Sequence, residues 1–356
     1  MKILVYNVAA EDGGGLFVLK NFYEDVKRLN SDIEWTFFIS ADILESTDRI
    51  KIEVFKETKE SWLKRWVFEN YKLPKIIESE NFDIVISLQN MPVKKCDKPQ
   101  LVYLHQSLQY CPKKFSMLKS EERGLAIRQK LICGLIKKNI KKAKHVFVQT
   151  EWIKSATMDW VGFSKDDITV VPVTLDINRV PVKPYVGQNS REFFYPARAE
   201  IYKNHKTVIE ACKILKRKGI DDFRVIFSIN SDAGVYEQKL SELSAGLPID
   251  FIGNVEYEKI WDYYSRTILL FPSYLETCGL PMLEVKMAKG RILASDTPFS
   301  HEALDGYANA DFFEYDNAEQ LAQKMEKMLA DSTYYEVNSE TTREEQSLLE
   351  KMIEFI

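Results

Sequence analysis

The sequence lacks several patterns that would assign it to a class at once. Its five cysteines are odd in number, widely spaced and free of CxxC pairs, which argues against a disulfide framework and a structural zinc site and favours a reducing cytosol. No apolar stretch approaches the ~18 residues that a membrane-spanning helix needs. The opening MKILVYNVAA has one lysine and no cleavable small-residue pattern, so we expect no signal peptide and a cytoplasmic protein.

An excess of charge of one sign is also absent. The chain has 49 Lys and Arg against 53 Asp and Glu, which gives a net charge of -4. No global electrostatic field therefore indicates nucleic acid as the partner, and any charged site must be local.

What the chain does have is length and a regular alternation. With 356 residues, 45% of them hydrophobic, it is long enough for two domains of roughly 150 residues each. Short apolar runs rich in Val, Ile, Phe and Tyr each precede a longer segment of helical period, which is typical of a parallel sheet wound with helices. The predicted fold class is α/β, with two doubly wound units in tandem.

The first domain is expected over residues 1–178 and the second over 179–334. Strand candidates in the first are 3–7, 34–40, 82–88, 101–105, 145–149 and 168–172, and helix candidates are 16–28 and 120–142. A polar segment with two prolines and a glycine, residues 175–192, is interpreted as the linker. Strand candidates in the second are 193–197, 223–229, 250–253, 268–272 and 291–295, and helix candidates are 206–217, 236–245, 257–265 and 281–288. A final helix within residues 335–356, apolar at Leu348, Leu349, Met352 and Ile353, is expected to pack back on the first domain.

Glycines and a histidine follow two predicted strands of the first domain, where ligands bind in an open parallel sheet. Gly13, Gly14 and Gly15 open the first helix, so backbone N–H groups there can approach a phosphate or a sugar. The spacing is not the dinucleotide fingerprint, because Val18 stands where that pattern needs glycine. His105 ends a strand and can donate to a substrate hydroxyl or carry a proton. A flexible turn and a histidine satisfied by backbone groups are the alternatives.

Charged side chains follow two predicted strands of the second domain. Arg198 and Lys203 come after one strand, and two cations five residues apart can grip a diphosphate from two sides. The stretch FPSYLETCGLPMLEVKMAKG places Glu276 in a loop and Glu284 in the first turn of a helix that Pro281 begins. Solvated side chains and a simple preference of acids for a helix start are the alternatives.

The same stretch has a second feature that suits a nucleotide sugar. The backbone amides of Cys278, Gly279 and Leu280 precede the predicted helix, whose dipole favours a phosphate at that end. Glu276 can accept hydrogen bonds from sugar hydroxyls, and Glu284 can accept two from the vicinal hydroxyls of a ribose.

Taken together, these residues resemble the family 4 nucleotide-sugar glycosyltransferases of the glycosyl transferases group 1 type. That family has the GT-B fold, in which two Rossmann-like domains face each other across a cleft. The resemblance covers nearly the whole chain, from MKILVYN to about Leu329. Its most specific part is the E-x7-E element from Glu276 to Glu284. It is accompanied by Arg198 and Lys203 after YPA, by His105, by the glycine turn 13–15 and by the VVPVTLD segment.

The resemblance implies a role for each of these residues. Arg198 and Lys203 would hold the donor diphosphate and stabilise the departing charge, and Glu284 would hold the ribose. Glu276 and the amides of residues 278–280 would hold the transferred sugar and the phosphates. The other domain would face the sugar with His105, Gly14 and Gly15. The implied catalytic residues are Glu276, His105, Arg198 and Lys203.

The implied reaction is transfer of a hexose-type sugar from a UDP-, GDP- or dTDP-sugar to a saccharide acceptor, in cell-surface polysaccharide synthesis such as that of capsule or O-antigen. Such enzymes retain the anomeric configuration, generally without a covalent intermediate. The sequence departs from the family at Thr277 and Cys278, where Gly and Phe are frequent, at Arg291 in place of Pro, and at Val173-Thr174 in place of Asn-Gly. The first two departures are expected to tune the choice of sugar. No D-x-D triplet occurs, so we expect neither a metal nor another cofactor.

A basic segment bears on the acceptor. Residues 128–144 read RQKLICGLIKKNIKKAK, with seven basic residues and no acidic one. The apolar residues recur at helical spacing, which suits a core-facing helix with a solvated basic face. It also suits peripheral binding to the inner face of the plasma membrane, with a lipid-linked acceptor. Two other functions stay open: a nucleotide-sugar epimerase of related fold, which would need no acceptor, and a catalytically inactive nucleotide-sugar-binding protein.

Overall fold

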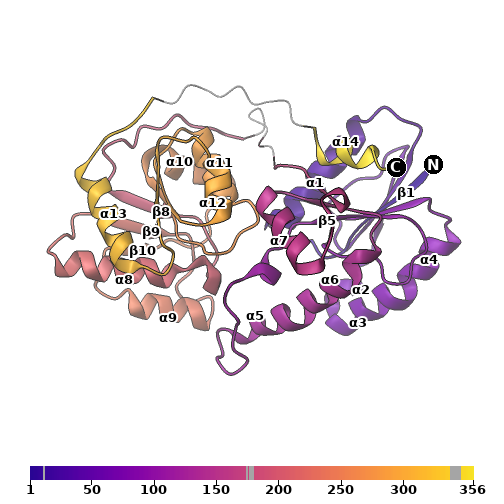
Figure 1. Ribbon diagram of the computed structural model, residues 1–356, viewed down its shortest axis with the longest axis horizontal. Helices are drawn as coiled ribbons and strands as arrows, with labels where there is room; N and C mark the ends of the chain where they lie inside the picture. The colour runs from indigo at the N-terminus through magenta and orange to yellow at the C-terminus, as the bar shows by residue number, and fades with distance from the viewer. Residues whose placement is uncertain (11–12, 174, 176–179, 337–345) are drawn as a thin grey trace. The chain divides into compact units, whose positions relative to one another are not determined.

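The computed structural model describes residues 1–10, 13–173, 175, 180–336 and 346–356 of the chain. These residues form two compact units, each built on one parallel sheet (Figure 1). The first unit comprises Met1–Pro112, Ile127–Val173 and Arg343–Ile356, and the second comprises Lys113–Ala126 and Thr174–Thr342. The predicted fold class, two doubly wound α/β units, is confirmed.

The first unit has a seven-stranded sheet in the order β3-β2-β1-β4-β5-β6-β7. Its strands are β1 (Lys2–Asn7), β2 (Glu34–Ile39), β3 (Ile50–Val54), β4 (Ile84–Ser87), β5 (Gln100–Leu104), β6 (His145–Val148) and β7 (Ile168–Val170). Apolar side chains alternate between its two faces: Ile3 and Val5 join the core that contains α1 (Gly13–Arg28), whereas Leu4 and Tyr6 join a separate core. The strand order reverses between β1 and β4, and ligands bind at such a point in open parallel sheets.

A helical run between β3 and β4 was not predicted. It consists of α2 (Glu57–Glu60), α3 (Trp62–Val67), the π-helical turn η1 (Phe68–Lys72) and α4 (Leu73–Ser79). Its apolar residues fall into an exposed group and a buried group: Trp62 is 68% and Leu63 61% exposed, whereas Phe68 and Leu73 are each 1% exposed. A π-helical turn adds one residue and shifts the phase of the pattern, so no single helical period runs through the segment.

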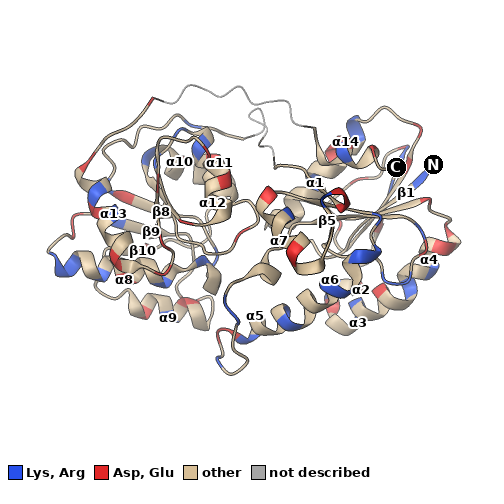
Figure 2. Cartoon of the chain, in the orientation of Figure 1, with Lys and Arg blue, Asp and Glu red and all other residues tan. Residues whose placement is uncertain are grey.

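The basic segment belongs to a longer helical run. It comprises α5 (Arg123–Ile127), the π-helical turn η3 (Arg128–Ile132), α6 (Cys133–Asn139) and the 3-10 turn η4 (Ile140–Lys142). Ile136 and Ile140 are buried in a core with β6 and β7, whereas the basic side chains are exposed (Figure 2). Leu131 is also exposed, at 62%. The run is therefore a core-facing helix with a solvated basic face. In the described part of the chain no helix combines the length and apolarity needed to cross a membrane.

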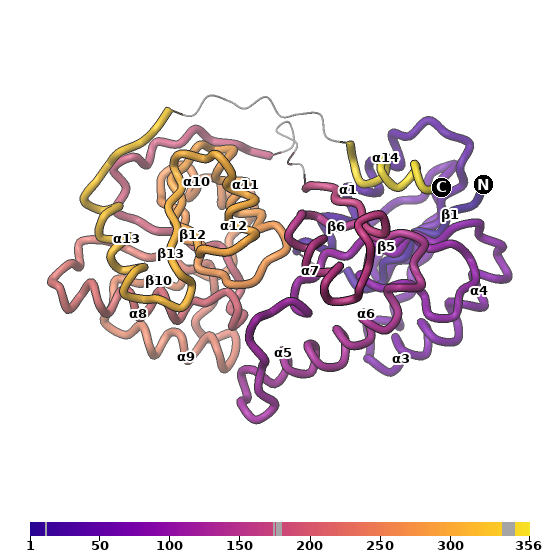
Figure 3. Tube along the Cα trace, in the orientation of Figure 1, coloured from indigo at the N-terminus to yellow at the C-terminus, as the bar shows by residue number. Residues whose placement is uncertain are grey.

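The remaining helices of the first unit are η2 (Leu108–Tyr110), α7 (Glu151–Val161), η5 (Lys165–Asp167) and, at the end of the chain, α14 (Leu348–Ile353). α14 lies beside α1 (Figure 3), and its Leu349 and Met352 are buried in the core that β1 shares with α1. Phe355 then places its ring 3.9 Å from that of His145. Residues 337–345 of the predicted terminal segment lie outside the described residues.

The second unit has a six-stranded sheet in the order β10-β9-β8-β11-β12-β13. Its strands are β8 (Glu192–Tyr195), β9 (Arg224–Phe227), β10 (Ile249–Phe251), β11 (Ile268–Phe271), β12 (Ile292–Ser295) and β13 (Ala310–Phe313). Its helices are η6 (Ile201–Lys203), α8 (His205–Arg217), α9 (Val235–Leu243), α10 (Tyr257–Arg266), α11 (Leu280–Met287), α12 (Pro298–Ala303) and α13 (Ala318–Ala330). The order reverses between β8 and β11. Of the predicted linker 175–192, residues 176–179 lie outside the described residues, as does Thr174.

One segment groups differently from the expectation. Residues 113–126 were placed in the first domain, but Lys113–Ala126 forms part of the second unit. Contacts within the second unit include Glu121, which accepts from Lys239 at 2.7 Å, and Lys113, whose Nζ lies 4.6 Å from the ring centroid of Tyr274. Contacts distant in sequence decide this grouping, and local periodicity cannot reveal them.

Arg291, a departure from the family pattern, has a structural role in the second unit. It is 5% exposed, and its guanidinium donates to the carbonyls of Gln188 at 3.1 Å, Met328 at 3.2 Å and Asp331 at 2.8 Å. Burial lowers the pKa of the guanidinium. The side chain therefore ties the start of the unit to the end of α13, which proline at this position could not do.

Candidate functional site

Lys203 and Glu276 form an ion pair at the point where the second sheet reverses its strand order. Lys203 ends η6, which follows β8, and Glu276 lies in the loop after β11. Lys203 Nζ is 2.6 Å from Glu276 Oε1, and the side chains are 20% and 14% exposed respectively. The site lies beyond the carboxyl ends of two adjacent strands, the usual position for a ligand in this architecture.

Several hydrogen bonds fix the two loops that carry this pair. Tyr195, the last residue of β8, shares a hydrogen bond of 2.7 Å with Ser273 and donates to the carbonyl of Lys203 at 2.9 Å. Asn204 has a left-handed backbone with φ of 64°, and its amide donates to the carbonyls of Pro272 at 3.1 Å and Tyr315 at 2.6 Å. The pair is therefore held by a rigid, buried frame.

The other predicted cation, Arg198, lies three residues beyond β8 and is exposed. The structure thus places Lys203 against a carboxylate, whereas Arg198 stays on the solvent-facing side of the same loop. An arginine fork and a lysine point charge that follow the same strand are chemically suited to phosphate oxygens.

The loop after Glu276 turns sharply into α11. Gly279 has φ of 68°, and a Cβ built on it would come within 2.4 Å of Met282 Cε, so this position favours glycine. Within the first turn of α11, Pro281 has no N–H, and the N–H of Met282 donates to the carbonyl of Gly279 at 2.9 Å. A phosphate at this helix start would therefore meet the backbone amides that come before Pro281. Cys278 is buried, and burial raises the pKa of its thiol to about 12, so it is not a thiolate nucleophile at neutral pH.

Glu284 was expected in the first turn of α11, but the helix begins at Leu280 and its first turn contains no acidic residue. Glu284 is 6% exposed, and its carboxylate accepts from Tyr264 at 2.7 Å and from Tyr257 at 3.0 Å. Burial raises the pKa of Glu284, and the two tyrosine hydroxyls partly oppose that shift. The tyrosines lie seven residues apart in α10, a helical spacing that could have pointed to a shared partner, but the sequence analysis did not single them out.

His105 and the glycines lie in the first unit. The imidazole Nε2 is 3.0 Å from the carbonyl of Leu88, and burial lowers the pKa of His105, so the ring is neutral and Nε2 carries the proton. Nδ1 is then an acceptor. A Cβ on Gly15 would lie 3.7 Å from His105 Cε1, whereas no described residue comes within 4 Å of one on Gly14. Gly15 and His105 are thus neighbours.

Among the described residues, no group of three or more His, Cys, Asp or Glu side chains is arranged to hold a metal ion. Glu276 is paired with the ammonium of Lys203, so this carboxylate has little negative charge left for a cation. The polar groups of the second-unit site are suited to a phosphate and to hydroxyl groups instead.

Comparison with known proteins gives consistent results. Residues 179–345 match the family described as Glycosyl transferases group 1. The O-antigen chain mannosyltransferase RfbU of Salmonella typhimurium is 23% identical over 183 residues, which is 50% of each chain. The match thus spans about half the length of that relative.

Solved structures resemble both units together. A sucrose-phosphate synthase from Thermosynechococcus elongatus has a TM-score of 0.71 at 14% identity, covering 93% of this chain and 90% of that one. Anabaena Alr3699/HepE in complex with UDP and glucose has a TM-score of 0.65 at 15% identity, with the same coverage. WaaG, a glycosyltransferase involved in lipopolysaccharide biosynthesis, has a TM-score of 0.65 at 12% identity, covering 93% and 91%. These likenesses establish the GT-B fold. Residues 179–345 thus resemble the glycosyl transferases group 1 family, and the chain has the GT-B fold.

Proposed function

We propose that this enzyme transfers a hexose from a nucleotide diphosphate sugar to a saccharide acceptor, with retention of configuration and without a metal ion, in the synthesis of a cell-surface polysaccharide. The observation that carries this proposal is the ion pair of Lys203 and Glu276 beside the start of α11. The relatives support the substrate class: RfbU is an O-antigen chain mannosyltransferase, and HepE binds UDP-glucose.

The diphosphate is the first group that the site would bind. Lys203 is already held in place, so a phosphate next to its ammonium costs little ordering of the side chain. Arg198 supplies a planar fork from the exposed side, and the backbone N–H groups of the turn that precedes Pro281 supply uncharged donors. Together they stabilise the negative charge that develops on the leaving nucleoside diphosphate as the glycosidic bond breaks.

The two glutamates would bind different parts of the donor. Glu276 accepts hydrogen bonds from the hydroxyls of the transferred sugar. A carboxylate has about four lone-pair sites, and the two tyrosines use two of those on Glu284. The remaining two match the vicinal hydroxyls of a ribose, and the tyrosines orient the carboxylate for them.

His105 would act on the sugar as a neutral group. Its Nε2–H is engaged by the carbonyl of Leu88, so Nδ1 is left to accept a hydrogen bond from a hydroxyl. Among the described residues, Glu276 is the one carboxylate that we propose contacts the transferred sugar, so the proposal does not use the pair of acids found in retaining hydrolases. A leaving phosphate that takes the acceptor proton would then complete the transfer.

The acceptor is proposed to be lipid-linked, which would bring the protein to the inner face of the plasma membrane. The exposed Leu131 lies among the exposed basic residues of the run from 128 to 144, a combination typical of helices that lie on anionic membranes. A variant with Lys137, Lys138, Lys141 and Lys142 changed to Glu should lose flotation with anionic liposomes. Unchanged flotation of this variant would rule out the basic face as the contact.

A thermal-shift screen of UDP-, GDP- and dTDP-sugars tests the proposed function directly, because a ligand that binds only the folded state raises the Tm. We expect one nucleotide class to raise it and Arg198→Ala to abolish the rise. No rise with any of them at millimolar concentration contradicts donor binding. A nucleotide-sugar epimerase would instead convert the sugar with no acceptor present, which a product analysis of the same mixtures reveals.

A further inference from the structure

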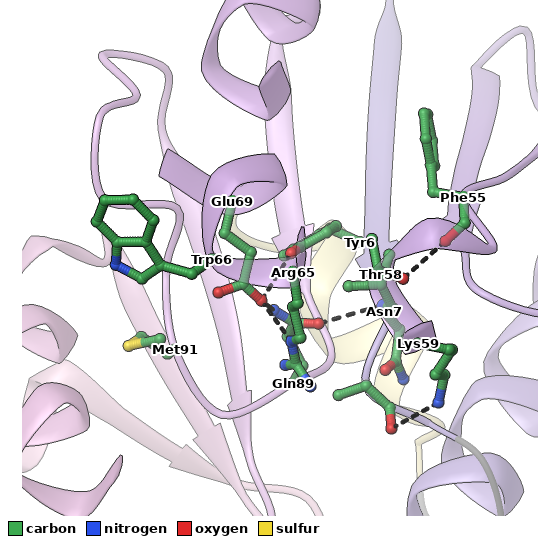
Figure 4. A network of polar contacts seen from close by, with 12 residues as sticks. Tyr6, Asn7, Phe55, Thr58, Lys59, Arg65, Trp66, Glu69, Gln89 and Met91 are labelled. Atoms are coloured by element: carbon green, nitrogen blue, oxygen red, sulfur yellow. Dashed lines mark hydrogen bonds and ion pairs between the residues drawn. The ribbon is translucent and has the colours of Figure 1, made fainter. Parts of the chain in front are cut away.

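The strand-order reversal in the first unit also holds a polar cluster, which the transfer site of the second unit does not use. Glu69, in the π-helical turn η1, accepts through Oε1 from Arg65 at 2.9 Å, from Tyr6 at 3.1 Å and from Gln89 at 3.3 Å. Tyr6 is near the end of β1, and Gln89 follows β4 (Figure 4). The cluster therefore bridges the two strands between which the sheet reverses.

The members of this cluster are locked in place. Tyr6 is 2% and Gln89 8% exposed, and the carbonyl of the Gln89 amide accepts from the backbone N–H of Val8 at 3.2 Å. Burial, reinforced by the negative charge of Glu69, raises the pKa of Tyr6 well above its usual value, so its hydroxyl remains a donor. Three donors on a single oxygen fix the orientation of the Glu69 carboxylate.

The second carboxylate oxygen, Oε2, is left available. Within the described residues it has no hydrogen-bond partner, although the Glu69 side chain is only 17% exposed. In Figure 4 the Glu69 carboxylate lies between the indole of Trp66 and the sulfur of Met91 on one side and Arg65 on the other. A recess of about 10 Å3, lined by Glu69, Gln89 and Met91 among others, has room for a single hydroxyl group.

Two exposed aromatic residues flank Glu69 in the sequence, and Figure 4 shows the Trp66 indole on the Met91 side of the Glu69 carboxylate. Trp66 is 36% and Tyr71 52% exposed, and their rings meet edge to face at 5.6 Å. The electron-rich face of an indole attracts the weakly positive C–H groups on one side of a pyranose ring, and its N–H can donate to a hydroxyl. The π-helical turn that presents Glu69 next to Trp66 is itself a feature frequent at functional sites.

We propose that Glu69 Oε2, the Trp66 indole and Met91 form a saccharide-binding subsite of the first unit, which takes one hexose unit of the acceptor. The carboxylate oxygen accepts from one or two sugar hydroxyls, and the indole packs on the apolar side of the ring. The identification of the bound hexose as part of the acceptor rests on the proposed function. The binding of a hexose at this subsite does not depend on it.

Tryptophan indole signals in a 1H–15N spectrum give a direct test. The chain has six tryptophans, and Trp66→Phe identifies the signal of Trp66. The probes are the methyl α-glycosides of mannose, glucose and galactose, without any nucleotide. We expect at least one to shift the Trp66 signal saturably, with a Kd on the order of millimolar, while Trp62, on the same helix and more exposed, stays unchanged.

The matched pair Glu69→Gln and Glu78→Gln then separates the carboxylate from general surface charge. Glu69→Gln should weaken glycoside binding about tenfold, because a charge-assisted hydrogen bond becomes a neutral one. Glu78→Gln, at an exposed site on α4, should have no effect. Tyr6→Phe leaves the carboxylate in place and should weaken binding less than Glu69→Gln does.

The possible outcomes decide between the subsite and its alternatives. The proposal is wrong if no glycoside at about 100 mM shifts the indole signal of Trp66. It is also wrong if the signal of Trp62 shifts equally, or if the Glu69→Gln variant binds the glycoside as tightly as the parent protein. A response of Trp66 to anionic vesicles but to no glycoside would make this face a lipid contact and also overturn it. Nucleotide-sugar thermal shifts on the same variants report the second unit separately, so failure of donor binding and failure of the subsite are distinguishable.

Discussion

Lys203 Nζ lies 2.6 Å from Glu276 Oε1, although the two residues are 73 positions apart in the sequence. The lysine follows one strand of the second sheet and the glutamate follows its neighbour, so the pair forms only when the sheet is assembled. A partly buried pair of this kind holds both groups ready for a ligand that carries negative charge on one side and hydroxyls on the other. The relationship leads to the first prediction.

Changing Lys203 to Met should abolish nucleotide-sugar binding, with a loss of about 100-fold or more in affinity, because it removes a phosphate partner and leaves Glu276 uncompensated. Isothermal titration with the nucleotide sugar that raises the Tm measures this. Lys213→Met removes a lysine that pairs with Glu210 on the surface of α8 and should leave affinity unchanged. Equal affinity of the two variants would show that Lys203 does not contact the donor.

Glu276→Gln should separate binding from transfer. The glutamine keeps the shape and some hydrogen bonding but not the charge, so nucleotide affinity should change little while the rate of sugar transfer falls by about 100-fold. Steady-state kinetics with a saturating donor check this. A fall in donor affinity with an unchanged rate at saturation would instead assign Glu276 to the nucleotide part of the site.

Glu284 should make stability depend on pH in a defined direction. Burial raises the pKa of its carboxyl in the folded state, so the folded protein binds a proton that the unfolded protein has released. The free energy of unfolding contributed by this group is present below the ordinary glutamate pKa and decreases as pH rises through the raised one.

Urea unfolding at a series of pH values above about 4.3, the ordinary glutamate pKa, measures this effect. Glu284→Gln should flatten the dependence. Tyr264→Phe removes a donor to the charged form, so it should raise the pKa of Glu284 further and extend the decrease to higher pH. A parent protein whose stability rises with pH over this window, by the same amount as the glutamine variant, would contradict the assignment.

Arg291→Met should destabilise the second unit by about 2–4 kcal/mol, since it leaves three carbonyls without charge-assisted donors. Those of Gln188, Met328 and Asp331 are its partners. Arg217→Met, at the exposed end of α8, serves as the control and should change stability by less than about 0.5 kcal/mol. Thermal unfolding followed by circular dichroism measures both, and similar Tm values would show that the clamp contributes little.

Alkylation should leave Cys278 intact in the folded enzyme. Burial raises the pKa of its thiol to about 12 and shields the sulfur, and the thiolate is the reactive form. Cys96 and Cys111 are both half-buried and should react with iodoacetamide before Cys278 does. Mass spectrometry of peptides after graded exposure gives the order, and early modification of Cys278 in folded protein would show that the loop before α11 opens.

The sequence determined the alternation of strands and helices, and with it the two doubly wound units, because burial of both faces of a parallel sheet leaves a strong local pattern. The sequence also located the polar residues that follow the strands, because the residue types themselves show which side chains can bind phosphates and hydroxyls. The helix predictions failed where the hydrophobic period was interrupted. The π-helical turn at Phe68–Lys72 shifts the phase of its helix, and the run that contains it went unrecognised.

Tertiary structure alone decided which residues meet. Lys203 was predicted to bind a diphosphate together with Arg198, and the fold adds an ion pair between Lys203 and Glu276. Glu284 was interpreted as a ribose ligand at a helix start, and the fold adds Tyr257 and Tyr264. The cluster around Glu69 joins residues from β1, η1 and the loop after β4. Each of these contacts depends on how strands are ordered in a sheet, and strand order is set by the packing of the whole unit, which no local stretch of sequence records.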